Sequence, residues 1–106
     1  MAKNHKNLKH LEWIRTWPCA LSIHRDCFGS IEAHHLMRPW SGKRGMGMKA
    51  GDENALPLCQ RHHIMLHKRG DEEAFFEEMQ GSPSWGRATS QSLWYRSPAF
   101  KEFKYE

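Results

Sequence analysis

The sequence predicts one small α+β domain in which helices and two short strands surround metal-binding side chains. Its 106 residues can bury one modest core, and brief apolar runs lie between segments of helical periodicity. Eight histidines accompany three cysteines, which cannot all pair, so metal binding is favoured over a disulfide framework. We expect the domain to span residues 1–80 and an aromatic tail to follow at residues 81–106.

The N-terminal part predicts a helix followed by a loop. Residues 4–16 have amphipathic spacing, with Leu8 and Leu11 on one side. Pro18 ends this helix, because the residue before a proline avoids the helical region. Residues 19–29 are polar and contain two of the cysteines, so we expect a loop there.

The central part predicts two strands and two helices. Residues 30–37 favour a short strand, and the glycine-rich residues 39–54 favour a long loop, which inside a compact domain usually carries function. Residues 55–58 are long enough only for a brief second strand. Helices are expected at residues 59–69 and 71–80, because a glycine follows the first and an aspartate begins the second.

The tail begins with a linker at residues 81–84 and then contains a series of aromatic residues. We expect these rings to pack back on the small core. The alternatives are stacking on nucleic-acid bases or contact with a second subunit. The rings are those of Trp85, Trp94, Tyr95, Phe100, Phe103 and Tyr105.

Positive charge is concentrated in the first two thirds of the chain. Residues 1–68 contain 11 Lys and Arg against 5 Asp and Glu, whereas residues 69–106 contain 5 against 7. The basic part also contains the cysteines and histidines, so a polyanion is the natural partner. No apolar run approaches a membrane span, and the charged first residues do not fit a secretory signal, which favours a cytoplasmic protein.

Four histidines form the first candidate site. His63 and His67 are four residues apart, which on a helix places both imidazoles on one face, ready to share a metal. His34 and His35 are adjacent, so on a strand they point to opposite faces. One can then bind the metal while the other stays free to take a proton from water. Asn54 can hold an imidazole in one orientation by hydrogen bonding.

Three cysteines and a histidine form the second candidate site. Cys59 and His62 are three residues apart at the start of one predicted helix, a usual half-site for structural zinc. Cys19 and Cys27 could supply the other two ligands from the preceding loop. Four such ligands leave no open position, which is typical of structural zinc and would help so small a chain to fold without disulfides.

The spacing of these residues resembles that of the HNH, or ββα-metal, endonucleases. The intervals from Asn54 to His63 and from His63 to His67 are similar to those of the colicin DNases. Residues 59–63 resemble the zinc-bearing branch of the family, with His62 where a second cysteine often stands. Small phage and prophage members, in the neighbourhood of the RecA-dependent phage recombination nuclease, are similar at residues 32–36, 42–49 and 56–59 and at Asp52.

The resemblance covers roughly residues 8–80 and implies a ββα-metal core that hydrolyses DNA to a 3′-hydroxyl and a 5′-phosphate. His35 would be the general base that activates water. Asn54 would orient the base or brace the loop, a role that Asp52 would share or replace. One catalytic divalent cation, Mg²⁺, Mn²⁺, Ni²⁺ or Zn²⁺, would be bound by His34, His63 and His67.

The resemblance also implies a structural zinc on Cys19, Cys27, Cys59 and His62. The spacing of the first two cysteines departs from that of the family, which makes His24 an alternative to Cys27. The DNA phosphates would be contacted with weak sequence preference by Arg38, Lys43, Arg44, Lys49 and Arg61. A homodimer would let one site per chain cut both strands. The alternative function is a non-catalytic, zinc-stabilised module that binds nucleic acid or assists recombination or assembly.

Overall fold

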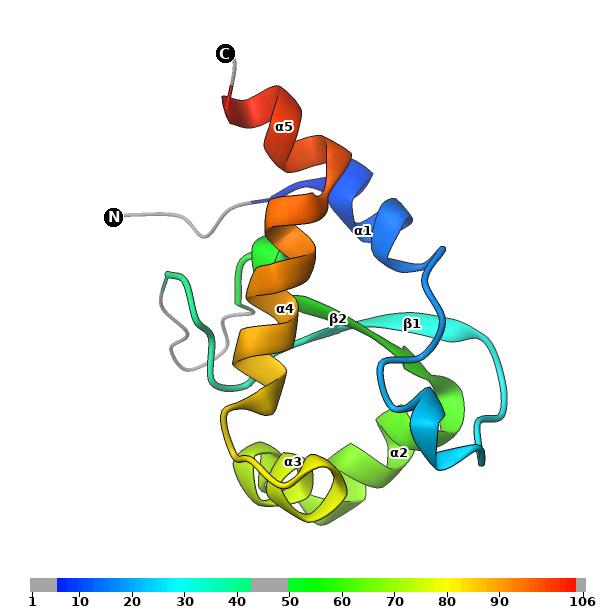
Figure 1. Cartoon of the computed structure of the whole chain (residues 1–106). Coiled ribbons are helices and arrows are strands. Elements are labelled where there is room, and N and C mark those ends of the chain that lie inside the picture. The colour runs from blue at the N-terminus through cyan, green and yellow to red at the C-terminus, as the bar shows by residue number, and fades with distance from the viewer. Residues whose placement is uncertain (1–5, 43–49, 105–106) are drawn as a thin grey trace.

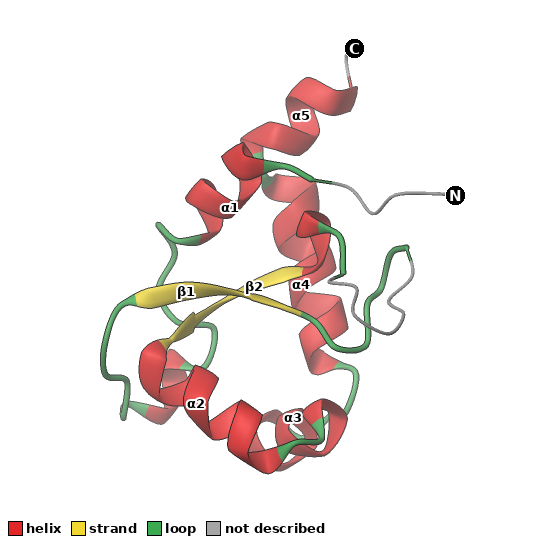
Figure 2. Ribbon diagram, turned by 180° about the vertical axis from the view of Figure 1, so that it is seen from behind, coloured by secondary structure: helices red, strands yellow, loops and turns green. Residues whose placement is uncertain are grey.

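The computed structural model describes residues 6–42 and 50–104 and has an α+β fold, as the sequence predicts (Figure 1). A small antiparallel sheet has α2 and α3 on one side and α1 and α5 on the other, and α4 runs alongside the sheet and reaches α3 (Figures 1 and 2). The helices and strands are α1 (Leu8–Ile14), β1 (Ile31–His35), β2 (Ala55–Cys59), α2 (Gln60–Arg69), α3 (Glu72–Gln80), α4 (Trp85–Arg96) and α5 (Pro98–Lys104). Short 3₁₀ turns occur at Ser22–His24 and Asp52–Asn54.

The two strands and the helix after them form one continuous unit. β1 pairs with β2 so that Ile31 lies opposite Cys59 and His35 lies opposite Ala55. Every residue of β2 is buried, because helices cover both faces of this strand. α2 begins directly after β2, where the Cys59 sulfur accepts the backbone N–H of His62 and caps the helix. The strand thus delivers a potential metal ligand to the first turn of α2.

The first helix is shorter than the predicted span of residues 4–16. The Asn7 side chain accepts the backbone N–H of His10, so the helix begins at Leu8. It ends at Ile14, one turn before Pro18, and Leu11 and Ile14 are buried on its inner face. The capping asparagine therefore sets the start of the helix, although apolar periodicity alone suggested an earlier one.

The tail is helical, which the sequence did not indicate. Its helix α4 packs across β2 and α3, and Gly86 of this helix lets the Phe76 ring approach. Trp94 is buried, and the Trp85 ring lies 5.1 Å from that of Phe76. Tyr95 remains 49% exposed, although its ring contacts that of Phe100. The Phe103 side chain and Tyr105 lie outside what the structure describes.

The helices in the described part of the chain are all too short or too polar to cross a lipid bilayer.

Candidate metal centres

The histidine cluster, which we define as His34, His63 and His67, joins β1 to α2. The Nδ1 atom of His34 lies 3.2 Å from Nε2 of His63, and Nε2 of His67 lies 3.1 Å from the same atom. All three ligand nitrogens fall within 4.8 Å of one another. The sequence placed two of these imidazoles on one helix face, and the strand pairing brings the third to them.

Carboxylates behind two of the rings fix which nitrogen faces the cluster. Nε2 of His34 lies 2.7 Å from Glu72, and Nδ1 of His63 lies 2.7 Å from Glu32. Because each carboxylate accepts a hydrogen bond from the ring N–H, the opposite nitrogen of each imidazole keeps its lone pair. Two lone pairs then face each other across 3.2 Å, an arrangement that a cation relieves. The donor set therefore fits a divalent metal.

The surroundings of His34 favour the neutral imidazole that binds metals. Burial lowers the pKa of His34 and outweighs the opposing effect of the Glu72 carboxylate. Burial alone would raise the pKa of Glu72, but hydrogen bonds from His34 and from the backbone N–H groups of Met37 and Arg38 lower it overall. A charged carboxylate thus supports a neutral ring at neutral pH.

His35 lies outside the histidine cluster and has its own acidic partner. Its Nε2 atom is 2.7 Å from Oδ1 of Asp52, and the other oxygen of Asp52 accepts the backbone N–H of Asn7 at 2.6 Å. The carboxylate thus holds the Nε2 proton, and Nδ1 is left as the basic nitrogen. The side chains of His35 and Asp52 are each 14% exposed, so water can reach the pair.

Asn54 braces the loop and does not orient His35. Its buried side-chain oxygen accepts the backbone N–H groups of Trp40 and Ser41 at 2.8 and 3.2 Å. Its amide nitrogen donates to the carbonyls of Ser41 and Gly51 at 3.0 and 3.3 Å. Of the two roles that the family resemblance implied, the structure places bracing on Asn54 and the contact with His35 on Asp52.

The cysteine cluster, defined as Cys19, Cys27, Cys59 and His62, gathers four donors from two distant segments. The three sulfurs lie 3.4, 3.7 and 3.3 Å from Nδ1 of His62 in that order. Nε2 of His62 lies 2.7 Å from Asp26, so Nδ1 is free to bind a metal. This Cys₃His set is compatible with zinc binding.

Ionisation of the three thiols differs within the cysteine cluster. Burial raises the pKa of Cys19, and desolvation together with the neighbouring thiols raises that of Cys27 to about 12. The pKa of Cys59 is lowered, because hydrogen bonds from backbone N–H groups outweigh its desolvation. Loss of the proton from all three crowded thiols needs positive charge among them, which a bound zinc ion would supply.

His24, the alternative fourth ligand, lies elsewhere. Its Nε2 atom is 2.7 Å from the side-chain oxygen of Gln80, and its ring centre is 6.4 Å from that of His62. The sulfur of Cys27 occupies the place in the cluster. The left-handed backbone of Arg25, with φ of 61°, turns the chain between these two residues.

The predicted phosphate-contacting residues are only partly covered by the structure. The Arg38 side chain is 72% exposed and lies 3.7 Å from Glu73. Arg61 is 53% exposed and lies 3.4 Å from Asp26. Three further predictions, Lys43, Arg44 and Lys49, lie outside the described residues.

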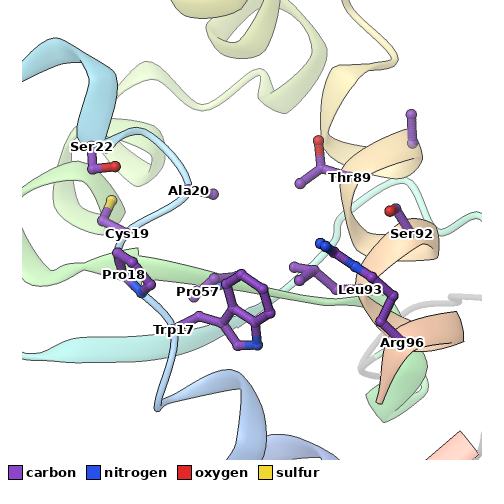
Figure 3. Close-up of a pocket in the computed structure, with 11 residues that line it drawn as sticks. Trp17, Pro18, Cys19, Ala20, Ser22, Pro57, Thr89, Ser92, Leu93 and Arg96 are labelled. Carbon is purple, nitrogen blue, oxygen red and sulfur yellow. The ribbon is translucent and has the colours of Figure 1, made fainter.

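A hollow of about 440 Å³ lies on the side of β2 that faces away from the histidine cluster, between α4 and the loop after α1 (Figure 3). Pro57 forms part of its lining, and the Arg96 guanidinium stands 5.0 Å from the Trp17 ring centre. Pro57 alternates with Leu56, the partner of His34 in the sheet, so the hollow and the histidine cluster face opposite ways. The candidate chemistry therefore belongs to the α2 side.

Sequence reasoning named Asp52, the partner of His35, but missed the acidic partners of the imidazoles in the two clusters. Glu72 is buried in the first turn of α3. Acidic residues are common at this position, because their negative charge interacts favourably with the positive end of the helix dipole. Glu32 and Asp26 precede ligands in the chain without any spacing that marks them. The register of β1, the packing of α3 and the course of the loop before β1 bring Glu32, Glu72 and Asp26, in that order, to the rings.

Comparison with known proteins gives a family. The family described as "Protein of unknown function (DUF968)" matches residues 2–88. The chain is also 40% identical over 76 residues to "Uncharacterized protein YdfU" of Escherichia coli strain K12, an alignment that covers 70% of this chain and 19% of that protein. The chain thus spans about a fifth of the length of that relative. No solved structure matches it significantly. Because the match covers most of its length, the chain belongs to the DUF968 family.

Proposed function

We propose that this chain is a metal-dependent DNA endonuclease with an HNH, or ββα-metal, centre. The observation that carries the proposal is the convergence of three imidazole nitrogens on the β1–β2–α2 unit, with an acid-supported histidine next in sequence. Three protein ligands leave room for a phosphate oxygen or water, as a catalytic site requires. The excess of basic residues in the same part of the chain favours DNA as the substrate.

The chain's own residues supply the base and its orientation. Asp52 holds the Nε2 proton of His35, and Nδ1 takes a proton from a water molecule. The oxygen of that water forms a bond to phosphorus while the bond from phosphorus to the 3′ oxygen breaks. The products are a 3′-hydroxyl, which gains a proton, and a 5′-phosphate. A divalent cation bound by the histidine cluster supplies Lewis-acid stabilisation of the phosphate and of the leaving oxygen.

The cysteine cluster has a structural role in this proposal. Its four donors are the usual ligands of a closed zinc site, which has no position for substrate. It fixes the loop before β1 to the start of α2, and α2 bears two ligands of the histidine cluster. Zinc would therefore support the catalytic centre by holding its helix in place.

The test is plasmid cleavage by the zinc-loaded protein with Mg²⁺, Mn²⁺, Ni²⁺ or added Zn²⁺. His35→Ala should lower the rate by about 100-fold or more, because it removes the base, while fold and DNA binding persist. His24→Ala is the matched control, since this exposed histidine lies outside both clusters, and it should cut at the parental rate.

Equal cleavage by the His35→Ala variant would refute the assignment of the base. A parent that binds DNA but cuts none with any of the four cations would instead be the non-catalytic module.

A further inference from the structure

A groove of about 430 Å³ runs along α2, on the flank of the histidine cluster. Two large apolar side chains that line the groove are exposed to water. Phe28 has 74% of its surface exposed and Ile64 has 47%. Such exposure of large apolar groups in one groove is typical of a binding surface. The lining consists of Phe28, Gln60, Arg61, Ile64, Met65 and Lys68.

The backbone beneath Phe28 is fixed although its ring is exposed. The carbonyls of Phe28 and Ser30 accept the N–H groups of Arg61 and Gln60, each at 3.0 Å. Gly29 between them has φ of +86°, and a Cβ atom there would lie 2.5 Å from the Gln60 side chain. Only glycine lets this loop approach α2 so closely. The backbone that carries the ring is therefore fixed before any ligand arrives, which lowers the entropic cost of binding.

The groove adjoins the histidine cluster along the helix. Ile64 directly follows His63, and Lys68 directly follows His67, so the two sets of side chains occupy neighbouring faces of α2. Arg61 and Lys68 lie on one side, about 10 Å apart along the helix axis. Lys68 forms no ion pair within residues 6–42 and 50–104, so its charge is available to a ligand.

We propose that this groove binds a nucleobase of the DNA strand whose phosphate lies at the histidine cluster. The inference rests on the proposed function and specifies how the substrate is held. A nucleotide combines a flat apolar ring with an anionic backbone, which matches an exposed aromatic ring beside free positive charge. The volume of the groove suits a group of this size. In either of two binding modes, Phe28 contacts the face of a base. The base is either unpaired or part of a base-pair step that Phe28 opens.

The test is DNA binding by the zinc-loaded chain of 106 residues carrying His35→Ala, so that the DNA is not cut. The probes are a fluorescently labelled single-stranded oligonucleotide and the same sequence as a duplex, each also made with 2-aminopurine. Phe28→Ala should weaken binding about tenfold and abolish quenching of 2-aminopurine, because stacking is lost. Phe28→Trp should restore both, whereas Phe28→Leu should restore neither fully.

Two further variants separate the effects of apolar surface and charge. Ile23→Ala is the matched control, since Ile23 is 75% exposed in the same loop but does not line the groove, and it should bind as the parent does. Lys68→Gln should reduce the slope of log K against log salt by about one, because one phosphate contact is lost.

Parental affinity and quenching in Phe28→Ala, or no DNA binding at all, would overturn the inference and leave the groove to another partner such as a protein. Loss confined to the single strand assigns an unpaired base, and equal loss on duplex assigns a wedge between base steps. Cleavage is scored separately in the chain with His35 intact. If the chain cleaves DNA but its DNA binding does not depend on Phe28, this inference alone is wrong. If DNA binding depends on Phe28 but the chain cleaves no DNA, the proposed function alone is wrong.

Discussion

At the scale of single residues, the imidazoles differ in how firmly their orientation is held. The Glu72 side chain is 3% exposed and accepts hydrogen bonds from the His34 ring and from the backbone N–H groups of Met37 and Arg38. Glu32, behind His63, is 43% exposed and competes with water. The buried carboxylate should therefore contribute more to metal affinity than the exposed one, because water screens the latter.

We expect Glu72→Gln to weaken cobalt binding at the histidine cluster by about 10- to 100-fold. The amide cannot serve all the N–H groups that the carboxylate accepts, so His34 loses its fixed tautomer. Glu32→Gln is the matched control and should have a smaller effect. Titration calorimetry and the visible spectrum of bound Co²⁺ measure both.

Zinc content at the cysteine cluster should not change in either variant, which separates ligand positioning from loss of fold. Equal cobalt affinity for Glu72→Gln and the parent would contradict this role for Glu72.

At the scale of elements, the sequence predicted those in which local signals and packing agree. Residues 30–37 and 55–58 were predicted as strands, and the structure has Ile31–His35 and Ala55–Cys59. The predicted helix at residues 59–69 is α2, Gln60–Arg69. Here a capping side chain, a following glycine and the spacing of the ligands all favour the same boundaries.

The helix α4 could not be predicted because its stability comes from packing. Residues 85–96 include a glycine, a threonine and three serines or glutamines on a weakly amphipathic pattern. The helix forms because Leu93 and Trp94 are buried and Gly86 fits under Phe76. Glu72 and Glu32, the acidic partners within the histidine cluster, escaped prediction for the same reason, since tertiary contacts alone bring them to the rings.

Gly86→Ala should destabilise the domain by about 1–3 kcal/mol, because the added Cβ would meet the Phe76 ring. Its distance to the nearest ring carbon would be 2.4 Å. The sign is diagnostic, since alanine in an unobstructed helix is favoured over glycine by about 1 kcal/mol. Urea denaturation followed by circular dichroism measures the change.

The exposed Gln91 on the same helix offers the comparison, and Gln91→Ala should lie within about 0.5 kcal/mol of the parent. A more stable Gly86→Ala protein would show that α4 does not pack on α3 as described.

At the scale of the whole molecule, the cysteine cluster ties together parts of the chain that are far apart in sequence. Cys19 and His62 are separated by 43 positions and meet at 3.4 Å. A metal bound there joins the loop after α1 to the strand–helix junction on which α2 depends. In so small a domain, such a metal cross-link would provide a large part of the folding free energy.

Cys59→Ser, or removal of zinc by a chelator, should leave the domain unfolded at 37 °C or lower the midpoint of its thermal unfolding by more than about 10 °C. Cys59 both binds the metal and caps α2, so its loss affects the site and the helix together. Zinc content by atomic spectroscopy and melting by circular dichroism are the measurements.

His24→Ser, in the same loop but outside the cluster, should keep zinc and melt within a few degrees of the parent. Unchanged zinc content and melting in Cys59→Ser would remove the structural role of this cluster.

The four hydrogen bonds of Asn54 have a consequence for how the domain can diversify. One amide fastens both Ser41 and Gly51, so the chain leaves the core and returns to it at a single point. Doubling the number of residues between two such anchors costs only about 0.6 kcal/mol of closure entropy. A change in the length of this stretch is therefore expected to cost little stability and to leave His35, Asp52 and both candidate metal centres in place.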